Sequence, residues 1–146
     1  MLAGLIVFAC LALIIHQFIS PIHFSLNAPG VRINPDQFLI LVIVAFFIPA
    51  LGEEFIFRGI LLPRPQGWRQ IWVTSLLSVA MFVLWHPLQV WIGLPTGQPI
   101  FLTPGFLILV AGLGLICTAL TLRSGSLWPA VALHWVVVVG WKAGTG

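Results

Sequence analysis

Charged side chains are scarce in this sequence. Only 6% of its 146 residues are charged, three of them acidic and six basic, whereas 60% are hydrophobic. So few polar groups cannot cover a water-soluble domain of this size, which excludes that class and indicates an integral membrane protein. The six basic residues are spread along the chain and form no basic patch, which argues against nucleic-acid binding.

Cysteine is scarcer still, with two residues. Cys10 and Cys117 both fall inside apolar runs, and we interpret them as packed thiols that form no disulfide. The first apolar run, residues 2–15, has no Lys or Arg before it and no small-residue cleavage site after it. It therefore favours a retained membrane span over a cleaved signal peptide.

Long apolar runs dominate what is present. A bilayer needs about 20 residues per helix, and the runs that approach this length cover residues 2–19, 37–62, 71–91, 106–122 and 127–141. We expect an all-α integral membrane protein with about five transmembrane helices in a bundle and an active site between helices two, three and five. Residues 1–36 would form the first span and its loop, and residues 37–146 the functional core. Pro49 and Pro87 predict kinks or breaks in the second and third spans.

The basic residues of the loops predict an orientation for this multi-pass protein. Arg64, Arg69 and Arg123 belong to one side of the membrane, and Arg32 and Lys142 to the other. Because cytoplasmic loops carry an excess of Lys and Arg, this distribution favours a cytoplasmic N-terminus.

Two of the three acidic residues, Glu53 and Glu54, follow an apolar run directly. A charge at the bilayer centre costs roughly 2.5–3.5 kcal/mol on insertion scales, so such groups suggest function. Glu54 and Arg58 are four residues apart on one helix face and can pair, whereas Glu53 points about 100° away. Glu53 is then a spare carboxylate of the kind that a general base requires. The alternative is a structural ion-pair cluster at a helix end.

Two histidines bring further polar groups into the apolar spans. His86 ends a stripe at helical spacing that also contains Ser78 and Phe82, and His134 lies in the middle of the fifth span. Each alone would more often be a core histidine, but polar groups buried in one bundle find their partners in one another. We therefore expect both to join Glu53. The small residues of the fourth span, Gly112, Gly114 and Thr118, indicate only close helix packing.

A carboxylate and two imidazoles around a cavity can do two kinds of chemistry. They can activate a water for attack on a carbonyl while an imidazole stabilises the oxyanion. They can also ligate zinc through Glu53, His86 and His134. Spacing does not separate these alternatives, although the common zinc-protease pattern HExxH is absent. We favour a site without a metal or other cofactor.

Three motifs carry a resemblance to a known family. They are Glu53-Glu54-x-x-x-Arg58, Phe82-x-x-x-His86 and Ser126-Leu127-Trp128-Pro129-Ala130-x-x-x-His134. In this order, on three spans, they resemble the motifs of the CPBP family of intramembrane endopeptidases, which includes type II CAAX prenyl proteases and bacteriocin-processing or immunity proteins. The resemblance covers about residues 38–141.

The resemblance implies a role for each motif residue. Glu53 would be the base, His86 its partner in activating the water, and His134 a stabiliser of the tetrahedral oxyanion. Glu54 and Arg58 would be the orienting pair. The partners implied are the lipid bilayer and a membrane-associated protein or peptide substrate, such as a CAAX protein with a prenylated C-terminal Cys.

One position departs from the family pattern. The family's third motif usually has Asn or Asp four residues after the His, and here that residue is Val138. Loss of one oxyanion donor costs other enzymes about 10²–10³ in rate. The sequence therefore leaves open a weakened activity, or a non-catalytic membrane protein of the same fold that acts by binding.

Overall fold

The computed structural model describes residues 6, 35–62 and 67–145. The predicted first span, residues 2–19, lies outside the described residues apart from residue 6, as does the connector over residues 63–66. Every regular element in the described ranges is helical, and none is a strand. This confirms the all-α class predicted from the sequence.

The first described helix is the one that carries the acidic pair. It begins as α2 (Pro35–Ala45) and continues as two π-helical segments, η1 (Phe46–Glu53) and η2 (Phe55–Ile60). Pro49 lies inside η1, where the missing N–H of a proline interrupts the α-helical hydrogen-bond pattern. The sequence predicted a kink at this point, and here the chain takes wider π turns, which are common near functional sites.

Three longer helices complete the fold: α3 (Trp68–Trp91), α4 (Pro104–Ser124) and α5 (Trp128–Thr145), with the short η3 (Pro99–Leu102) before α4. Pro87 predicted a break or a kink; the helix does not break there, because α3 continues through Pro87 to Trp91. A proline removes only one hydrogen bond, and transmembrane helices tolerate this where other groups satisfy the backbone. The left-handed Gly125, at φ 66°, ends α4, as glycine does after many helices.

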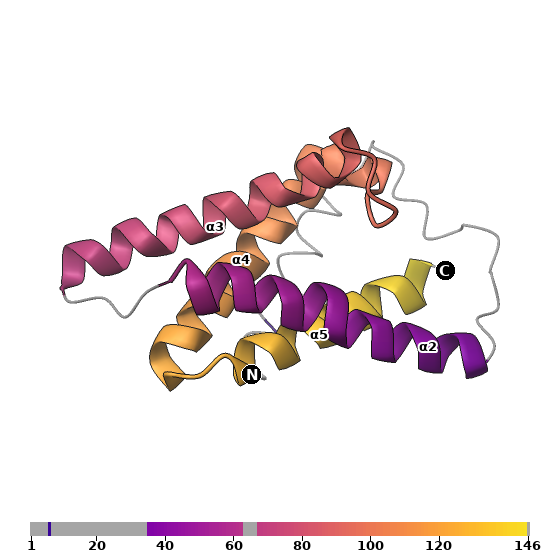
Figure 1. The fold of residues 1–146 in the computed structure, drawn as a ribbon, viewed down its shortest axis with the longest axis horizontal. Coiled ribbons are helices and arrows are strands. Elements are labelled where there is room, and N and C mark those ends of the chain that lie inside the picture. Colours follow the sequence, from indigo (N-terminus) through magenta and orange to yellow (C-terminus); the bar gives the residue numbers. More distant parts are fainter. Residues whose placement is uncertain (1–5, 7–34, 63–66, 146) are drawn as a thin grey trace.

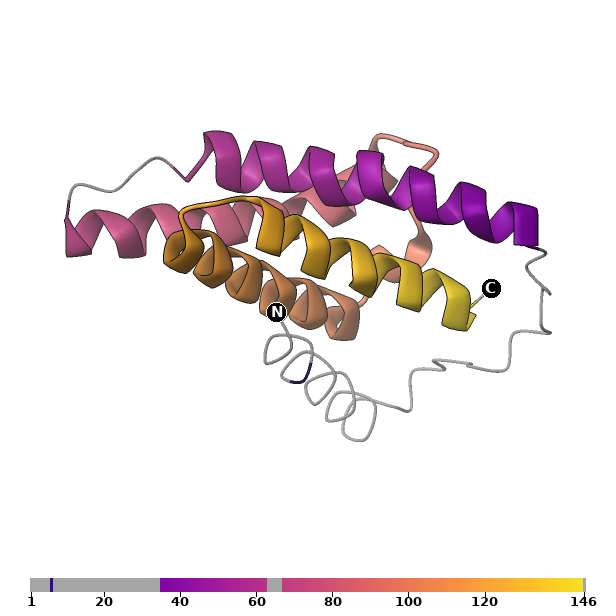
Figure 2. The ribbon, with the colours of Figure 1, turned by 90° about the horizontal axis from the view of Figure 1, so that it is seen from below.

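The helices are arranged so that two of them diverge. α3 contacts η2, and from there α2 and α3 separate toward the opposite end of the molecule (Figure 1). Seen from below, α5 lies between α2 and α4 (Figure 2), and it contacts both. Residues from the N-terminal half of the first described helix and from the C-terminal half of α3 line a common cavity.

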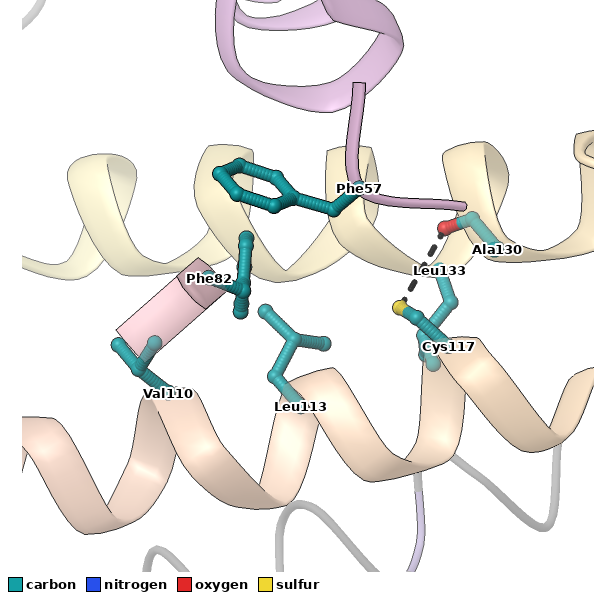
Figure 3. Packing of buried hydrophobic residues seen from close by; sticks show 7 residues of the cluster. All are labelled: Phe57, Phe82, Val110, Leu113, Cys117, Ala130 and Leu133. Carbon is teal, nitrogen blue, oxygen red and sulfur yellow. Dashed lines mark hydrogen bonds between the residues drawn. The ribbon is translucent and has the colours of Figure 1, made fainter. Parts of the chain in front are cut away.

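The core lies where the helices meet. Its buried residues come from η2, α3, α4 and α5 and are Phe57, Phe82, Val110, Leu113, Cys117, Ala130 and Leu133 (Figure 3). The Cys117 thiol lies 3.8 Å from the carbonyl oxygen of Ala130. Cys117 is thus a packed thiol, as the sequence predicted.

The outer faces are apolar. Within the described ranges, three helices are long and apolar enough to cross a membrane, Pro35–Ile60, Trp68–Trp91 and Pro104–Ser124; α5, with 18 residues, is not among them. Leu39, Ile40 and Leu84 are each about 60% exposed, as expected of surfaces that contact lipid. The exposed Trp68 and Trp91 mark the two ends of α3, where aromatic residues favour the membrane interface. The chain is an integral membrane protein.

Candidate active site

Arg58 organises the centre of the bundle. It is 2% exposed, and its Nη1 donates to Oε1 of Glu54 at 3.1 Å, which confirms the predicted pair. Its Nη2 donates to the carbonyl oxygen of Gly114 at 3.0 Å, and Nε lies 3.5 Å from Oγ1 of Thr118. The guanidinium carbon lies 4.3 Å from the ring centroid of Phe82. The pair is therefore held to α4 on one side and α3 on the other.

Gly114 leaves space for this arrangement, which a larger residue would crowd. A Cβ atom there would lie 3.1 Å from Nη2 of Arg58 and 3.1 Å from Cδ1 of Phe82. Both neighbours are packed in the core, so neither can move aside at low cost. The small residues predicted only to bring helices together thus also provide the place where the arginine binds.

Glu54 joins the ion pair to a histidine. The same Oε1 that accepts from Arg58 lies 2.9 Å from Nδ1 of His134, which belongs to α5. Because an ion-paired carboxylate only accepts hydrogen bonds, Nδ1 of His134 carries the proton. The other ring nitrogen, Nε2, is then free of the network and can meet a ligand.

Glu53 faces a different set of neighbours. Its Oε1 accepts a hydrogen bond from Nε1 of Trp85 at 3.1 Å. Its Oε2 is buried and has no hydrogen-bond partner within the described residues. Nε2 of His134 lies 4.0 Å from Oε2, which is too long for a hydrogen bond. Glu53 is thus the spare carboxylate that the spacing predicted.

His86 occupies an aromatic setting on α3. Its Nδ1 lies 2.9 Å from the carbonyl oxygen of Phe82, one turn earlier. A carbonyl only accepts, so Nδ1 carries the proton and Nε2 presents a lone pair. Phe82, Phe101 and Phe106 surround the ring at centroid distances of 5.2–5.4 Å. The structure describes both His86 and Glu53, and no direct hydrogen bond joins them. The resemblance implies that the two residues activate a water together, and this could operate only through a molecule bound between them.

One cavity of about 830 Å³ joins these groups. Glu53, His86 and His134 all lie on its wall, and so does Val138. Most of the remaining wall is apolar and comes from the diverging parts of α2 and α3 together with α4 and α5. The sequence placed the site between the second, third and fifth spans; the structure adds α4, which contributes Phe106, Val110 and Leu113.

Glu53, His86 and His134 are the ligands that the zinc alternative would require. Across residues 35–62 and 67–145, no group of three His, Cys, Asp or Glu side chains is placed to hold a metal ion. Nδ1 of each histidine is already hydrogen bonded, and Trp85 binds one oxygen of Glu53. What the arrangement offers is a carboxylate oxygen and two imidazole Nε2 atoms beside an apolar cavity.

Sequence reasoning missed Trp85 and Gln89. Trp85 directly precedes a motif histidine, and the only signal for its role is that position. Gln89, 4% exposed, is a buried amide on the face of α3 that carries His86. The predicted stripe of polar residues could have been extended by one turn to include it.

Residues 35–140 match the family described as type II CAAX prenyl endopeptidase Rce1-like. No curated protein and no solved structure matches the chain. The matched range covers most of the chain, contains all three motifs and supports the resemblance seen in the sequence. The chain belongs to the Rce1-like family of type II CAAX prenyl endopeptidases.

Proposed function

We propose that this protein is an intramembrane endopeptidase that hydrolyses a peptide bond of a membrane-associated protein. The family is a protease family, and the observation that carries the proposal is Oε2 of Glu53. It is a buried carboxylate oxygen without a protein partner in the described part of the chain, on the wall of a cavity shared with His86 and His134. Buried oxygens of this kind need a partner, and water is the common one.

The proposed reaction uses these groups without a metal. Glu53 takes a proton from a water, and the resulting hydroxide attacks the carbonyl carbon of the scissile peptide bond. Nε2 of His134 lies 4.0 Å from Oε2, a separation that one water can bridge with two hydrogen bonds of about 2.8 Å. The proton on Glu53 then passes to the leaving amine as the C–N bond breaks, which restores the carboxylate.

His86 and His134 have separate parts in this proposal. Neutral His86 offers the lone pair of Nε2 to the water and helps to orient it. His134, whose Nδ1 is held by Glu54 at 2.9 Å, can donate from Nε2 to the oxyanion when it is protonated. Glu54 and Arg58 act by orienting His134 and do not touch the reacting atoms.

We propose a CAAX-type protein as the substrate. The family description supports it, and so does a mainly apolar cavity of about 830 Å³, which suits a lipid-modified segment. The test is to reconstitute the protein in liposomes with a farnesylated peptide that ends in Cys-aliphatic-aliphatic-Ser. Mass spectrometry should detect a shortened peptide that carries one ¹⁸O atom when the reaction is run in H₂¹⁸O. The same peptide left intact would contradict the proposal.

Chelators test the metal-independent form of the mechanism. We expect cleavage to persist after dialysis against EDTA and 1,10-phenanthroline. Loss of cleavage that zinc restores would replace this mechanism with a metal-dependent one.

Trp85 is proposed as a positioning residue for the base. Trp85→Phe keeps most of the ring and removes the N–H that donates to Glu53 Oε1. Hydrogen bonds to charged groups contribute about 1.5–3 kcal/mol, and 1.4 kcal/mol is tenfold in rate. We expect kcat to fall about tenfold or more while KM changes little. Trp91→Phe, on the same helix but 73% exposed, is the control, and equal losses in both variants would contradict a specific role for Trp85.

A second candidate function rests on Val138. Its apolar side chain stands on the cavity wall, one turn after His134, where the family motif usually has a donor. If the chain is a weakened enzyme, Val138→Asn should raise kcat, by up to about 10²-fold if the amide reaches the oxyanion. If neither the wild type nor Val138→Asn cleaves the peptide, the non-catalytic binding function is favoured.

A further inference from the structure

Gln89 lies on the wall of the cavity that contains the proposed base. It follows His86 by three residues, or about 4.5 Å along α3 at ~1.5 Å per residue. Its side chain is almost completely buried at 4% exposure. Burial of an amide is unfavourable unless its hydrogen-bonding groups find partners, so each polar atom of Gln89 calls for a partner.

The oxygen of this amide is bound by the loop after α3. Oγ1 of Thr96 donates to the side-chain oxygen Oε1 of Gln89 at 2.7 Å. The backbone N–H of Leu94 donates to the main-chain carbonyl oxygen of Gln89 at 2.9 Å. A Cβ atom at Gly97 would lie 2.7 Å from that carbonyl oxygen, so the loop packs directly on Gln89. The loop therefore fixes which way the amide is turned.

The nitrogen of the amide, Nε2, has no such partner among the described residues. A glutamine amide carries one acceptor and two N–H donors. Oε1 is occupied by Thr96, and within residues 35–62 and 67–145 no acceptor binds Nε2. This leaves an oriented pair of donors, on a side chain that is only 4% exposed, at a cavity that otherwise has mostly apolar walls.

We propose that Gln89 binds substrate by donating from Nε2 to a main-chain carbonyl oxygen close to the scissile bond. The inference rests on the proposed function and assigns a contact within the same site. An extended peptide advances about 3.3–3.6 Å per residue. Gln89 lies one helical turn from His86, so the bound carbonyl belongs within one or two residues of the bond that is cut. A peptide carbonyl is present in any sequence, so this contact aligns the substrate without selecting its side chains.

Binding is measured without turnover in the Glu53→Gln background, with the farnesylated peptide as probe. Gln89→Met keeps the length of the side chain and removes its donors, and we expect Kd to rise about tenfold. Gln89→Glu, which still accepts from Thr96 but cannot donate, should weaken binding at least as much. Gln70→Met, exposed at the other end of α3, is the matched control and should leave Kd unchanged.

A set of probes in which successive main-chain amides are replaced by trans-alkenes locates the contact. At one position, the replacement should weaken binding to protein that retains Gln89. The same probe should bind the Gln89→Met variant about as well as the unmodified peptide does, because the two groups act as a coupled pair. Equal effects at every position would overturn the inference, as would a loss confined to kcat when the variants are made with Glu53 intact.

The outcomes for the two proposals are distinct. If protein with Glu53 cleaves the probe but Gln89→Met leaves Kd and KM unchanged, only the role of Gln89 is wrong. If the wild type fails to cleave but Kd depends on Gln89, the binding role stands and the protease reaction is contradicted. If no variant binds the probe, both proposals are contradicted. Thr96→Val should weaken binding less than Gln89→Met. If both variants lost the same thermal stability and left Kd unchanged, Gln89 would serve only to hold the loop after α3.

Discussion

Glu53→Gln is expected to abolish peptide hydrolysis while the protein remains inserted and folded. The amide is nearly isosteric with the carboxylate and keeps an oxygen that can accept from Trp85, which binds Oε1 at 3.1 Å. It cannot take a proton from water. General-base catalysis contributes about 10²–10⁴-fold, so we expect kcat to fall by at least that factor. The measurement is the initial rate of cleavage of the farnesylated peptide in liposomes.

The chain contains a matched control for this substitution. Asp36, the third acidic residue, lies in the first turn of the same continuous helix and is exposed. Asp36→Asn makes the same chemical change outside the cavity and should leave cleavage unchanged. A Glu53→Gln protein with wild-type activity would rule out Glu53 as the base, and equal losses in both variants would point to a general effect of charge.

Arg58→Met is expected to have the largest effect on stability. It removes the guanidinium that binds Glu54, Gly114 and Thr118 and leaves Glu54, itself 0% exposed, without its counter-charge. Breaking a buried pair in this way costs about 3–5 kcal/mol. We expect a clear decrease in the temperature at which the detergent-solubilised protein unfolds, followed by circular dichroism. Cleavage should also fall, because Glu54 then holds His134 less firmly.

A second substitution separates the charge from the packing. Glu54→Gln in the Arg58→Met protein removes the uncompensated charge, so part of the lost stability should return. Arg69→Met, exposed at the start of α3, should have little effect on unfolding. If Arg58→Met were as mild as Arg69→Met, the buried network would not be a main source of stability. If the double variant were no more stable than Arg58→Met, the loss would come from packing.

Much of the fold could be predicted from the sequence, because charge is so sparse that each ionisable residue stands out. The spacing of Glu54 and Arg58 predicted their pair, and the apolar runs predicted the positions of the described helices to within a few residues. Helical period placed Ser78, Phe82 and His86 on one buried face of α3. These features follow from local periodicity, which a single sequence contains.

The remaining features depend on contacts between distant residues. Pro87 predicted a break or a kink, and the break is absent from α3. The local sequence does not show that neighbouring groups support the helix backbone there. Nothing local shows that Trp85 turns toward Glu53, 32 residues earlier, or that the Gly114 carbonyl receives Arg58. The resemblance paired Glu53 with His86, whereas of the two described histidines His134 lies nearer, with Nε2 at 4.0 Å from Oε2. Which imidazole stands nearer the base is decided by how α5 packs against η1.

The most direct test of the account is a crystal structure of the protein in a lipid phase, at a resolution that places ordered water. We predict a water within about 3.2 Å of Oε2 of Glu53, in reach of Nε2 of His86 or His134 and open to the cavity. A structure in which Oε2 is bound by a protein donor, or in which acyl chains exclude water from all three side chains, would contradict the hydrolytic site.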